Sequence, residues 1–210
     1  MKSKKVTIEF FHDVICSWCY ILSPRLRKLV KEIPEVEVIH HSFALSKSPE
    51  HTIRMFGSME NAKKEIMDHW RASNINDDNN RINADLMESR NFDYPHSLPG
   101  LLGCKAAELQ GGQKVHWDYF DLVQKAHLTE ARNIADLEVL YDIASKVGLN
   151  KEKFINDYNS KIVMKMVEDD IKLSKQKRIN SVPTLIINSE QKISGALKYN
   201  DLKELIIKNY

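Results

Sequence analysis

The stretch that decides the fold is residues 6–19, VTIEFFHDVICSWC, in which an apolar run is followed by a pair of cysteines. Residues 6–11 are rich in β-branched and aromatic side chains, which predicts a buried strand. The residues after the cysteines predict an amphipathic helix, with apolar positions at helical spacing: Leu22, Leu26, Leu29 and Ile33. We therefore expect Cys16 at a helix N-terminus, where unpaired amides and the helix dipole stabilise a thiolate.

The composition of the chain favours a globular protein over a nucleic-acid-binding or membrane-spanning one. The chain has 210 residues, a net charge of +2 and 42% hydrophobic residues. It can bury a large core, has no general attraction for nucleic acid, and contains no run that would span a membrane. Lys2, Lys4 and Lys5 are basic, but the apolar segment after them is too short for a secretory signal. We therefore expect a cytoplasmic protein, in which a C-x-x-C pair is more often catalytic or metal-binding than structural.

The remaining pattern predicts strands near both ends and helices between them. Residues 35–43 alternate as a second strand, and residues 46–174 show helical periodicity. Residues 183–188 and 192–194 predict a hairpin, and a last helix starts near Asn200. The predicted order is β-α-β, then a helical block, then β-β-α.

This order resembles that of the DsbA family. The resemblance rests on Cys16-Ser17-Trp18-Cys19 after the first strand and on Val182-Pro183-Thr184 before the late hairpin. Residues 129–136 (TEARNIAD) and 193–196 (ISGA) are similar to the FrnE-like, cytoplasmic branch. The resemblance implies an α/β fold, in which a thioredoxin-like fold is interrupted by a helical insertion domain. It places the thioredoxin-like domain at 1–45 and 175–210, and the insertion domain at 46–174.

Three segments depart from the family pattern. Ser17 stands where family members usually have proline. Residues 178–181 read RINS where Gly-Ile-x-Gly is common, so an easy left-handed helix end is missing. Residues 96–102 lack the histidine and arginine of a segment common in the FrnE-like branch, and we assign them no function.

The resemblance implies a thiol–disulfide oxidoreductase. Cys16 is then the nucleophile and Cys19 the resolving thiol. Pro183 is similar to the family's cis-proline, which faces the dithiol and leaves the Val182 backbone free to pair with an extended substrate. Trp18 is a further candidate for substrate contact, or for packing between the domains.

Two other residues near the motif have competing interpretations. Asp13 precedes the cysteines, so a buried carboxylate there could shuttle the proton of Cys19; a solvated turn residue is the alternative. Cys104 lies beside an apolar helical stripe, where a buried cysteine usually acts as a small hydrophobic residue.

A zinc site is the main alternative to redox chemistry. It would need two further ligands, drawn from Cys104 and from His12, His40 or His41, because no second C-x-x-C exists. We therefore expect no metal and no cofactor.

Two rival functions share this architecture. Kappa-type glutathione transferases and 2-hydroxychromene-2-carboxylate isomerases commonly have serine at the nucleophile position, where this chain has Cys16. A non-catalytic adaptor that delivers clients to a protease is the second rival. The expected partners are protein or peptide thiols and disulfides, with glutathione as a further candidate, and neither nucleic acid nor membrane.

Overall fold

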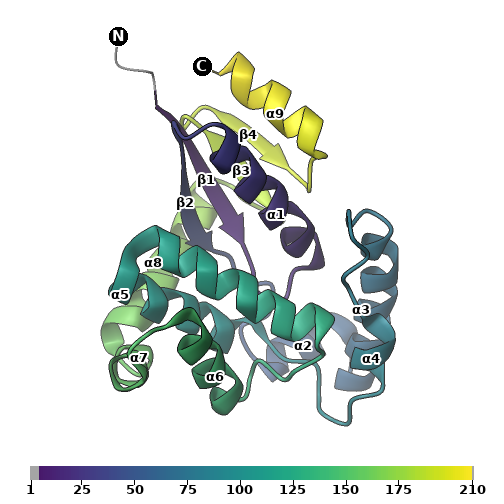
Figure 1. Ribbon diagram of the computed structural model, residues 1–210. Coiled ribbons are helices and arrows are strands. Elements are labelled where there is room, and N and C mark those ends of the chain that lie inside the picture. Colours follow the sequence, from purple (N-terminus) through teal and green to yellow (C-terminus); the bar gives the residue numbers. More distant parts are fainter. Residues whose placement is uncertain (1–4, 210) are drawn as a thin grey trace.

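The computed structural model describes residues 5–209, which contain a mixed four-stranded sheet (Figure 1). Its strands are β1 (Val6–His12), β2 (Val36–Ser42), β3 (Thr184–Ile187) and β4 (Gln191–Ser194). Their order is β2-β1-β3-β4, with β2 parallel to β1 and antiparallel pairing elsewhere. The parallel pair requires a crossover, whereas β3 and β4 form the predicted hairpin.

Both ends of the chain build the thioredoxin-like part. Helix α1 (Ser17–Glu32) connects β1 to β2, and α9 (Tyr199–Lys208) follows β4. These two helices lie side by side on one face of the sheet (Figure 1), where the Lys28 ammonium sits 3.9 Å from the ring centre of Tyr199. The predicted β-α-β start and β-β-α end are confirmed.

The chain between β2 and β3 is helical, as predicted. Its elements are α2 (Pro49–Phe56), α3 (Met59–Asn74), α4 (Ala84–Glu88), α5 (Ser97–Gln124), a π-helical turn η1 (Lys125–Thr129), α6 (Leu137–Val147), α7 (Lys151–Tyr158) and α8 (Lys161–Gln176). Many begin at a side chain that caps the free amides: Ser48, Ser58, Asn83, Asp136, Asn150 and Ser160. The division into two domains stays a prediction.

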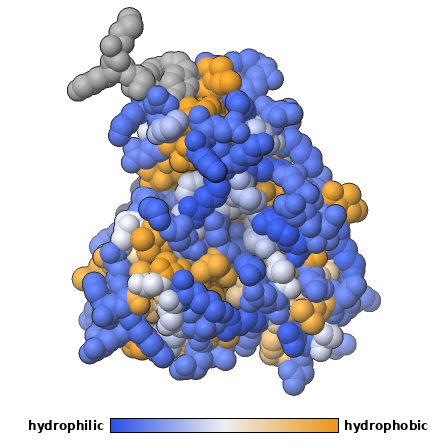
Figure 2. Space-filling model, viewed as in Figure 1, coloured by the Kyte–Doolittle hydropathy of each residue, from blue (hydrophilic) through white to orange (hydrophobic). Residues whose placement is uncertain are grey.

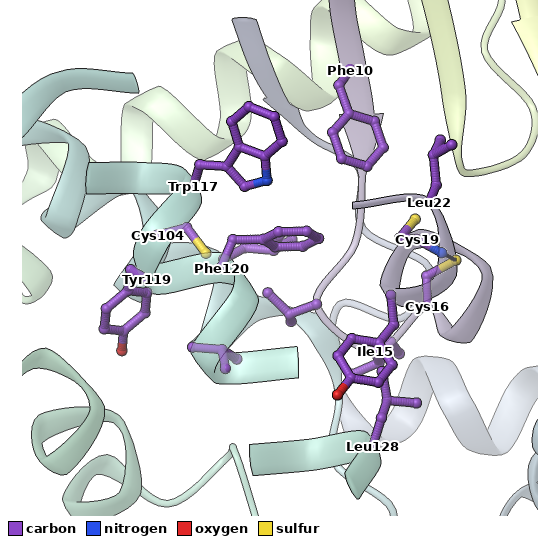
Figure 3. Packing of buried hydrophobic residues seen from close by; sticks show 14 of the residues in the cluster. Phe10, Ile15, Cys16, Cys19, Leu22, Cys104, Trp117, Tyr119, Phe120 and Leu128 are labelled. Atoms are coloured by element: carbon purple, nitrogen blue, oxygen red, sulfur yellow. Dashed lines mark hydrogen bonds between the residues drawn. The ribbon is translucent and has the colours of Figure 1, made fainter. Parts of the chain in front are cut away.

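Helix α5 is broken near its middle. Gly111 and Gly112 leave the helical conformation, and Gly112 has φ 68°, in the left-handed region that favours glycine. Side chains on both sides of the break reach the sheet: before it, the Lys105 ammonium donates to the carbonyl of His40 in β2 at 3.4 Å. Phe120 packs edge-on against Phe10 of β1, with ring centres 6.1 Å apart (Figure 3).

The two faces of the sheet follow from strand alternation. Ile8 and Phe10 of β1 are fully buried in the main core with α1 and α5, whereas Phe11 points to the other face and packs in a separate small cluster. Burying one such side chain contributes about 1.5–3 kcal/mol to stability. The face shown in Figure 2 is mostly hydrophilic with separate apolar patches.

Helix α8 ends in a left-handed residue although residues 178–181 lack the glycines that are common in the family. Arg178 takes the left-handed conformation itself, with φ 52°. The N–H of Ile179 then bonds back to the carbonyl of Ser174 at 2.8 Å, which closes the end of α8. An arginine thus adopts the conformation for which glycine is more usual.

Within residues 5–209, no helix has the length and apolar character needed to cross a bilayer.

Candidate active site

Cys16 lies where the sequence predicts, at the N-cap of α1. Its Sγ accepts the backbone N–H of Cys19 at 3.3 Å, and its carbonyl accepts the N–H groups of Cys19 and Tyr20 at 3.1 and 3.2 Å. An N-cap sulfur that receives an amide hydrogen bond is well placed to carry negative charge. Cys16 is 6% exposed and lines a surface cavity, so a substrate sulfur has a route to it.

Cys19 lies one turn further along α1 and is fully buried (Figure 3). Burial, together with the neighbouring Cys16 sulfur, raises the pKa of Cys19 well above its ordinary value. The two thiols of the pair therefore differ in access, which suits one for attack and the other for resolution.

In the reduced protein, iodoacetamide is expected to modify Cys16 before Cys19, and Cys104 only after unfolding. Only Cys16 borders the cavity, whereas burial raises the pKa of Cys19 and of Cys104 and so limits their thiolate fraction. Mapping the labelled peptides by mass against time checks the order. In guanidinium chloride all three cysteines should react at similar rates; modification of Cys19 first in the folded protein would contradict the assignment.

The loop before β3 faces the dithiol. The Val182–Pro183 peptide bond is cis, as the resemblance implies. The thiol of Cys16 donates to the Val182 carbonyl at 3.4 Å, so the two segments meet although they lie 166 residues apart. The structure thus brings Cys16, Cys19, Val182 and Pro183 together; the roles assigned to them stay predictions.

Beside Cys16 opens a largely apolar cavity of about 280 Å³. Its wall is formed by the loop between β1 and α1 (residues 13–16, called the active-site loop), the first turn of α1, helices α2 and α3, and the loops before α2, α5 and β3. Its apolar members are Ile15, Trp18, Leu45, Met55, Phe56, Ile66, Trp70, Tyr94 and Val182. Trp18 is 38% exposed there, so its ring is available to a ligand. Apolar walls of this kind are typical of cavities that receive an apolar group.

Asp13 is fully buried, so the solvated-turn interpretation is wrong. Burial raises the pKa of Asp13 to about 6. Within the described part of the chain, its carboxylate accepts hydrogen bonds from the Ser97 hydroxyl at 2.6 Å and from the N–H groups of Leu45 and Ile15 at 2.6 and 3.2 Å. These bonds join the active-site loop to the start of α5 and to the loop after β2. A proton-shuttle role for Asp13 stays a prediction.

Sequence reasoning missed the residues that hold the active-site loop. The buried amide of Gln124 donates to the carbonyls of Asp13 and Cys16 at 3.2 and 3.0 Å. The hydroxyl of Tyr94 donates to the carbonyl of Ile15 at 3.4 Å. In the sequence, the two donors lie 79 to 111 positions from the carbonyls that they bind. No local sequence motif identifies them.

Cys104 is buried in α5, as expected, and Figure 3 shows it beyond Phe120 from the active-site cysteines. His41 does not approach it; its ring nitrogens contact Asp170 and Glu9 at 3.0 and 3.6 Å. In the part of the chain that the structure describes, no cluster with metal-binding spacing includes a cysteine. The zinc set considered from sequence is therefore not assembled.

The family model described as the DSBA-like thioredoxin domain matches residues 7–206. Among curated relatives, the ClpXP adapter protein SpxH of Shouchella clausii is 26% identical over 211 residues, which cover 97% of this chain and 66% of the relative. The chain thus spans slightly less than two thirds of that protein's length.

Solved structures show the same fold at low sequence identity. The cytosolic disulfide reductase DsbM of Pseudomonas aeruginosa has a TM-score of 0.74 and 20% identity, over 97% of this chain and 98% of that chain. A structure described as a probable DsbA oxidoreductase of Streptomyces coelicolor has a TM-score of 0.73 and 19% identity, over 97% and 89%. The assignment to the FrnE-like branch stays a prediction. The match across residues 7–206, on a sheet with the dithiol at the start of α1, shows that this chain belongs to the DSBA-like thioredoxin domain family.

Proposed function

We propose that the protein is a thiol–disulfide oxidoreductase that exchanges electrons with protein or peptide disulfides and dithiols through Cys16 and Cys19. The observation that carries the proposal is the position of the Cys16 sulfur. It receives an amide hydrogen bond at the start of α1, faces the Val182 carbonyl, and borders an apolar cavity. Family membership supports the same class of reaction.

In the reducing direction, the Cys16 thiolate attacks one sulfur of a substrate disulfide. The substrate S–S bond breaks, one substrate sulfur leaves and takes up a proton, and a mixed disulfide forms with Cys16. Cys19 then loses its proton and attacks Cys16, which releases the second substrate thiol and leaves a Cys16–Cys19 disulfide. Two electrons and two protons pass to the substrate, and the reverse sequence oxidises a substrate dithiol.

Substrate is proposed to bind as an extended segment beside Val182 and Pro183. Main-chain pairing at that loop would supply affinity without reading sequence, as in other strand-addition complexes. The apolar cavity beside Trp18 would then hold a side chain next to the reacting cysteine. This arrangement favours peptide substrates that carry a large apolar residue near the disulfide.

Trapping tests the proposed function. With Cys19→Ala the resolving step is lost, so Cys16 is expected to retain its substrates as mixed disulfides that mass spectrometry can identify after non-reducing separation. Cys104→Ala is the matched control, because Cys104 is buried away from the cavity and its variant still resolves adducts. Absence of adducts on Cys16 in the Cys19→Ala variant, or equal adducts in the control, would contradict the proposal.

We propose glutathione as a small thiol partner of the protein. We also propose that the protein is located in the cytoplasm. The structure of DsbM, which its description calls a cytosolic disulfide reductase, has also been determined with GSH. A reducing compartment supplies glutathione in excess, which could regenerate the dithiol after each reduction.

A protease-adaptor role is the second candidate, favoured by the similarity to SpxH over 97% of this chain. An adaptor binds clients through its surface and does not need two thiols. The two functions separate in cells: a Cys16→Ala, Cys19→Ala protein would keep full activity as an adaptor and lose it as an oxidoreductase.

A further inference from the structure

Three buried histidines meet where β1, β2 and the second half of α5 come together. One ring nitrogen from each of His12, His40 and His116 lies within 4.8 Å of the other two. The rings contact one another, with centres 5.1 Å apart for His12 and His40, and 5.0 Å apart for His40 and His116. Three aromatic side chains contact the cluster: Phe10, Trp117 and Phe120.

Three of the six ring nitrogens of this cluster have no hydrogen-bond partner in the described part of the chain. Among residues 5–209, Nδ1 of His12 and both ring nitrogens of His40 are buried without a hydrogen bond. Buried polar atoms are normally paired with protein, water or an ion, so three such atoms in one cluster require a partner.

The spacing of two of the rings fits a shared metal ion. Nε2 of His12 and Nε2 of His116 are 3.3 Å apart, a distance at which one of the two nitrogens also donates a hydrogen bond to the other. Zinc binds histidine nitrogen at about 2.0–2.1 Å in tetrahedral geometry, which places two ligand nitrogens roughly 3.3–3.4 Å from each other. One ring nitrogen of His40 lies at most 4.8 Å from the ligand nitrogens of His12 and His116, so the His40 ring would have to move closer to them to reach the same spacing.

His116 is already oriented as a ligand. Its Nδ1 lies 2.7 Å from Oε2 of Glu108, so the Nδ1 proton is held by the carboxylate and the Nε2 lone pair points into the cluster. A carboxylate behind a ligating histidine is the usual outer partner in zinc sites, where it fixes the tautomer and makes the imidazole more basic.

The surrounding charges tolerate a cation. The ammonium of Lys105 lies close to the cluster and donates to the carbonyl of His40 at 3.4 Å, but it is also paired with Glu108 at 2.9 Å and with Asp170 at 2.8 Å, so two carboxylates face one ammonium. Arg27 lies further out and is paired with Asp118 and Asp121.

We propose that His12, His40 and His116 form a binding site for a divalent transition metal ion, with zinc as the best match, separate from the Cys16–Cys19 dithiol. Imidazole ligands favour zinc over magnesium or calcium, which prefer oxygen. Three protein ligands leave a fourth position for water. The ion would join two strands to α5 and fix the end of β1, from which the chain passes to the active-site loop.

Sequence reasoning considered His12 and His40 as ligands but not His116, which only the fold brings to them. A surface hollow lies next to residues that contact the cluster, and none of the three histidines lines it. It is lined by Gln113 and Trp117, whose side chains contact the backbone and the ring of His40.

The test uses the full chain carrying Cys16→Ser and Cys19→Ser, so that the dithiol cannot supply ligands, and zinc chloride as the probe after removal of metals by a chelator. Titration calorimetry is expected to show about one zinc ion per chain. Adding His116→Gln should weaken the affinity by at least about 100-fold. His69→Gln, at an exposed histidine of α3, is the matched control and should leave the affinity unchanged.

Cobalt in place of zinc should give visible absorption without the near-ultraviolet band of a thiolate ligand. If circular dichroism shows that His116→Gln does not fold, Glu108→Gln decides, because it keeps the three ligands and should weaken binding by about 10–100-fold. Lack of binding at micromolar zinc, unchanged affinity in the folded variant, or a thiolate band would overturn the site.

Discussion

Cys16→Ser is expected to reduce disulfide exchange on a model protein substrate to the uncatalysed rate. Serine keeps the N-cap hydrogen bond to the start of α1 but cannot form a disulfide with substrate, so the first covalent step is lost. Cys19 cannot substitute, because it is fully buried and its pKa is raised well above the ordinary value. Turnover of an insulin-type disulfide in the presence of glutathione measures the loss.

Two comparisons make this result specific. Cys16→Ser should unfold at nearly the same temperature as the parent protein, since serine is a good N-cap residue. Cys104→Ala should keep turnover close to the parent value, because Cys104 lies in the core of α5 and away from the cavity. Undiminished exchange by Cys16→Ser, or an equal loss in Cys104→Ala, would be incompatible with the assignment of the nucleophile.

Local pattern was sufficient for the elements near the chain ends. The β-branched and aromatic run before the cysteines forms β1, the apolar spacing after them forms α1, and the late alternation forms the β3–β4 hairpin. Periodicity also located the helical block, but not the break in α5. Gly111 and Gly112 are adjacent in the sequence, and a Gly-Gly pair is typical of a turn, so the break could have been predicted from this local signal.

The part of the candidate site that is formed by residues close together in the sequence could be predicted. Cys16 and Cys19 are positioned by one strand and one helix, and the resemblance to a known family supplied the loop at Val182 and Pro183. The residues that hold the active-site loop were not predictable, because each acts across the fold. Gln124 is an ordinary polar residue in an amphipathic helix, and only its burial against the loop carbonyls reveals its function.

Departures from the family pattern had smaller structural consequences than their chemistry suggested. Arg178 adopts the left-handed conformation expected of glycine, so the end of α8 is retained. Ser97, in a segment to which we assigned no function, donates to the buried carboxylate of Asp13. In this chain, residues that depart from the family pattern still close the end of α8, and the segment at Ser97 still takes part in a buried hydrogen bond.

Arg25→Met is expected to lower the free energy of unfolding by about 3 kcal/mol. Arg25 lies inside α1 and is only 2% exposed. Its guanidinium donates to the carboxylate of Asp78 at 2.7 and 2.9 Å, and to the carbonyls of Asn76, Ala196 and Leu197 at 2.7, 3.1 and 2.9 Å. Methionine keeps much of the stem but no donor, so the three carbonyls lose a charged partner.

An arginine-to-methionine substitution at an exposed site is the control, because it shows how much the free energy of unfolding changes when an arginine without these buried contacts is removed. Arg54→Met, on the exposed side of α2, should change stability by less than about 0.5 kcal/mol. Chemical denaturation of both variants measures the difference, and in a protein of this size each 1 kcal/mol corresponds to about 2–4 °C in Tm. Equal stability of the two variants would mean that Arg25 does not join α1 to the segments at Asn76 and Ala196. A selective loss in Arg25→Met would show that a buried cation holds together parts of the chain 51 to 172 positions apart.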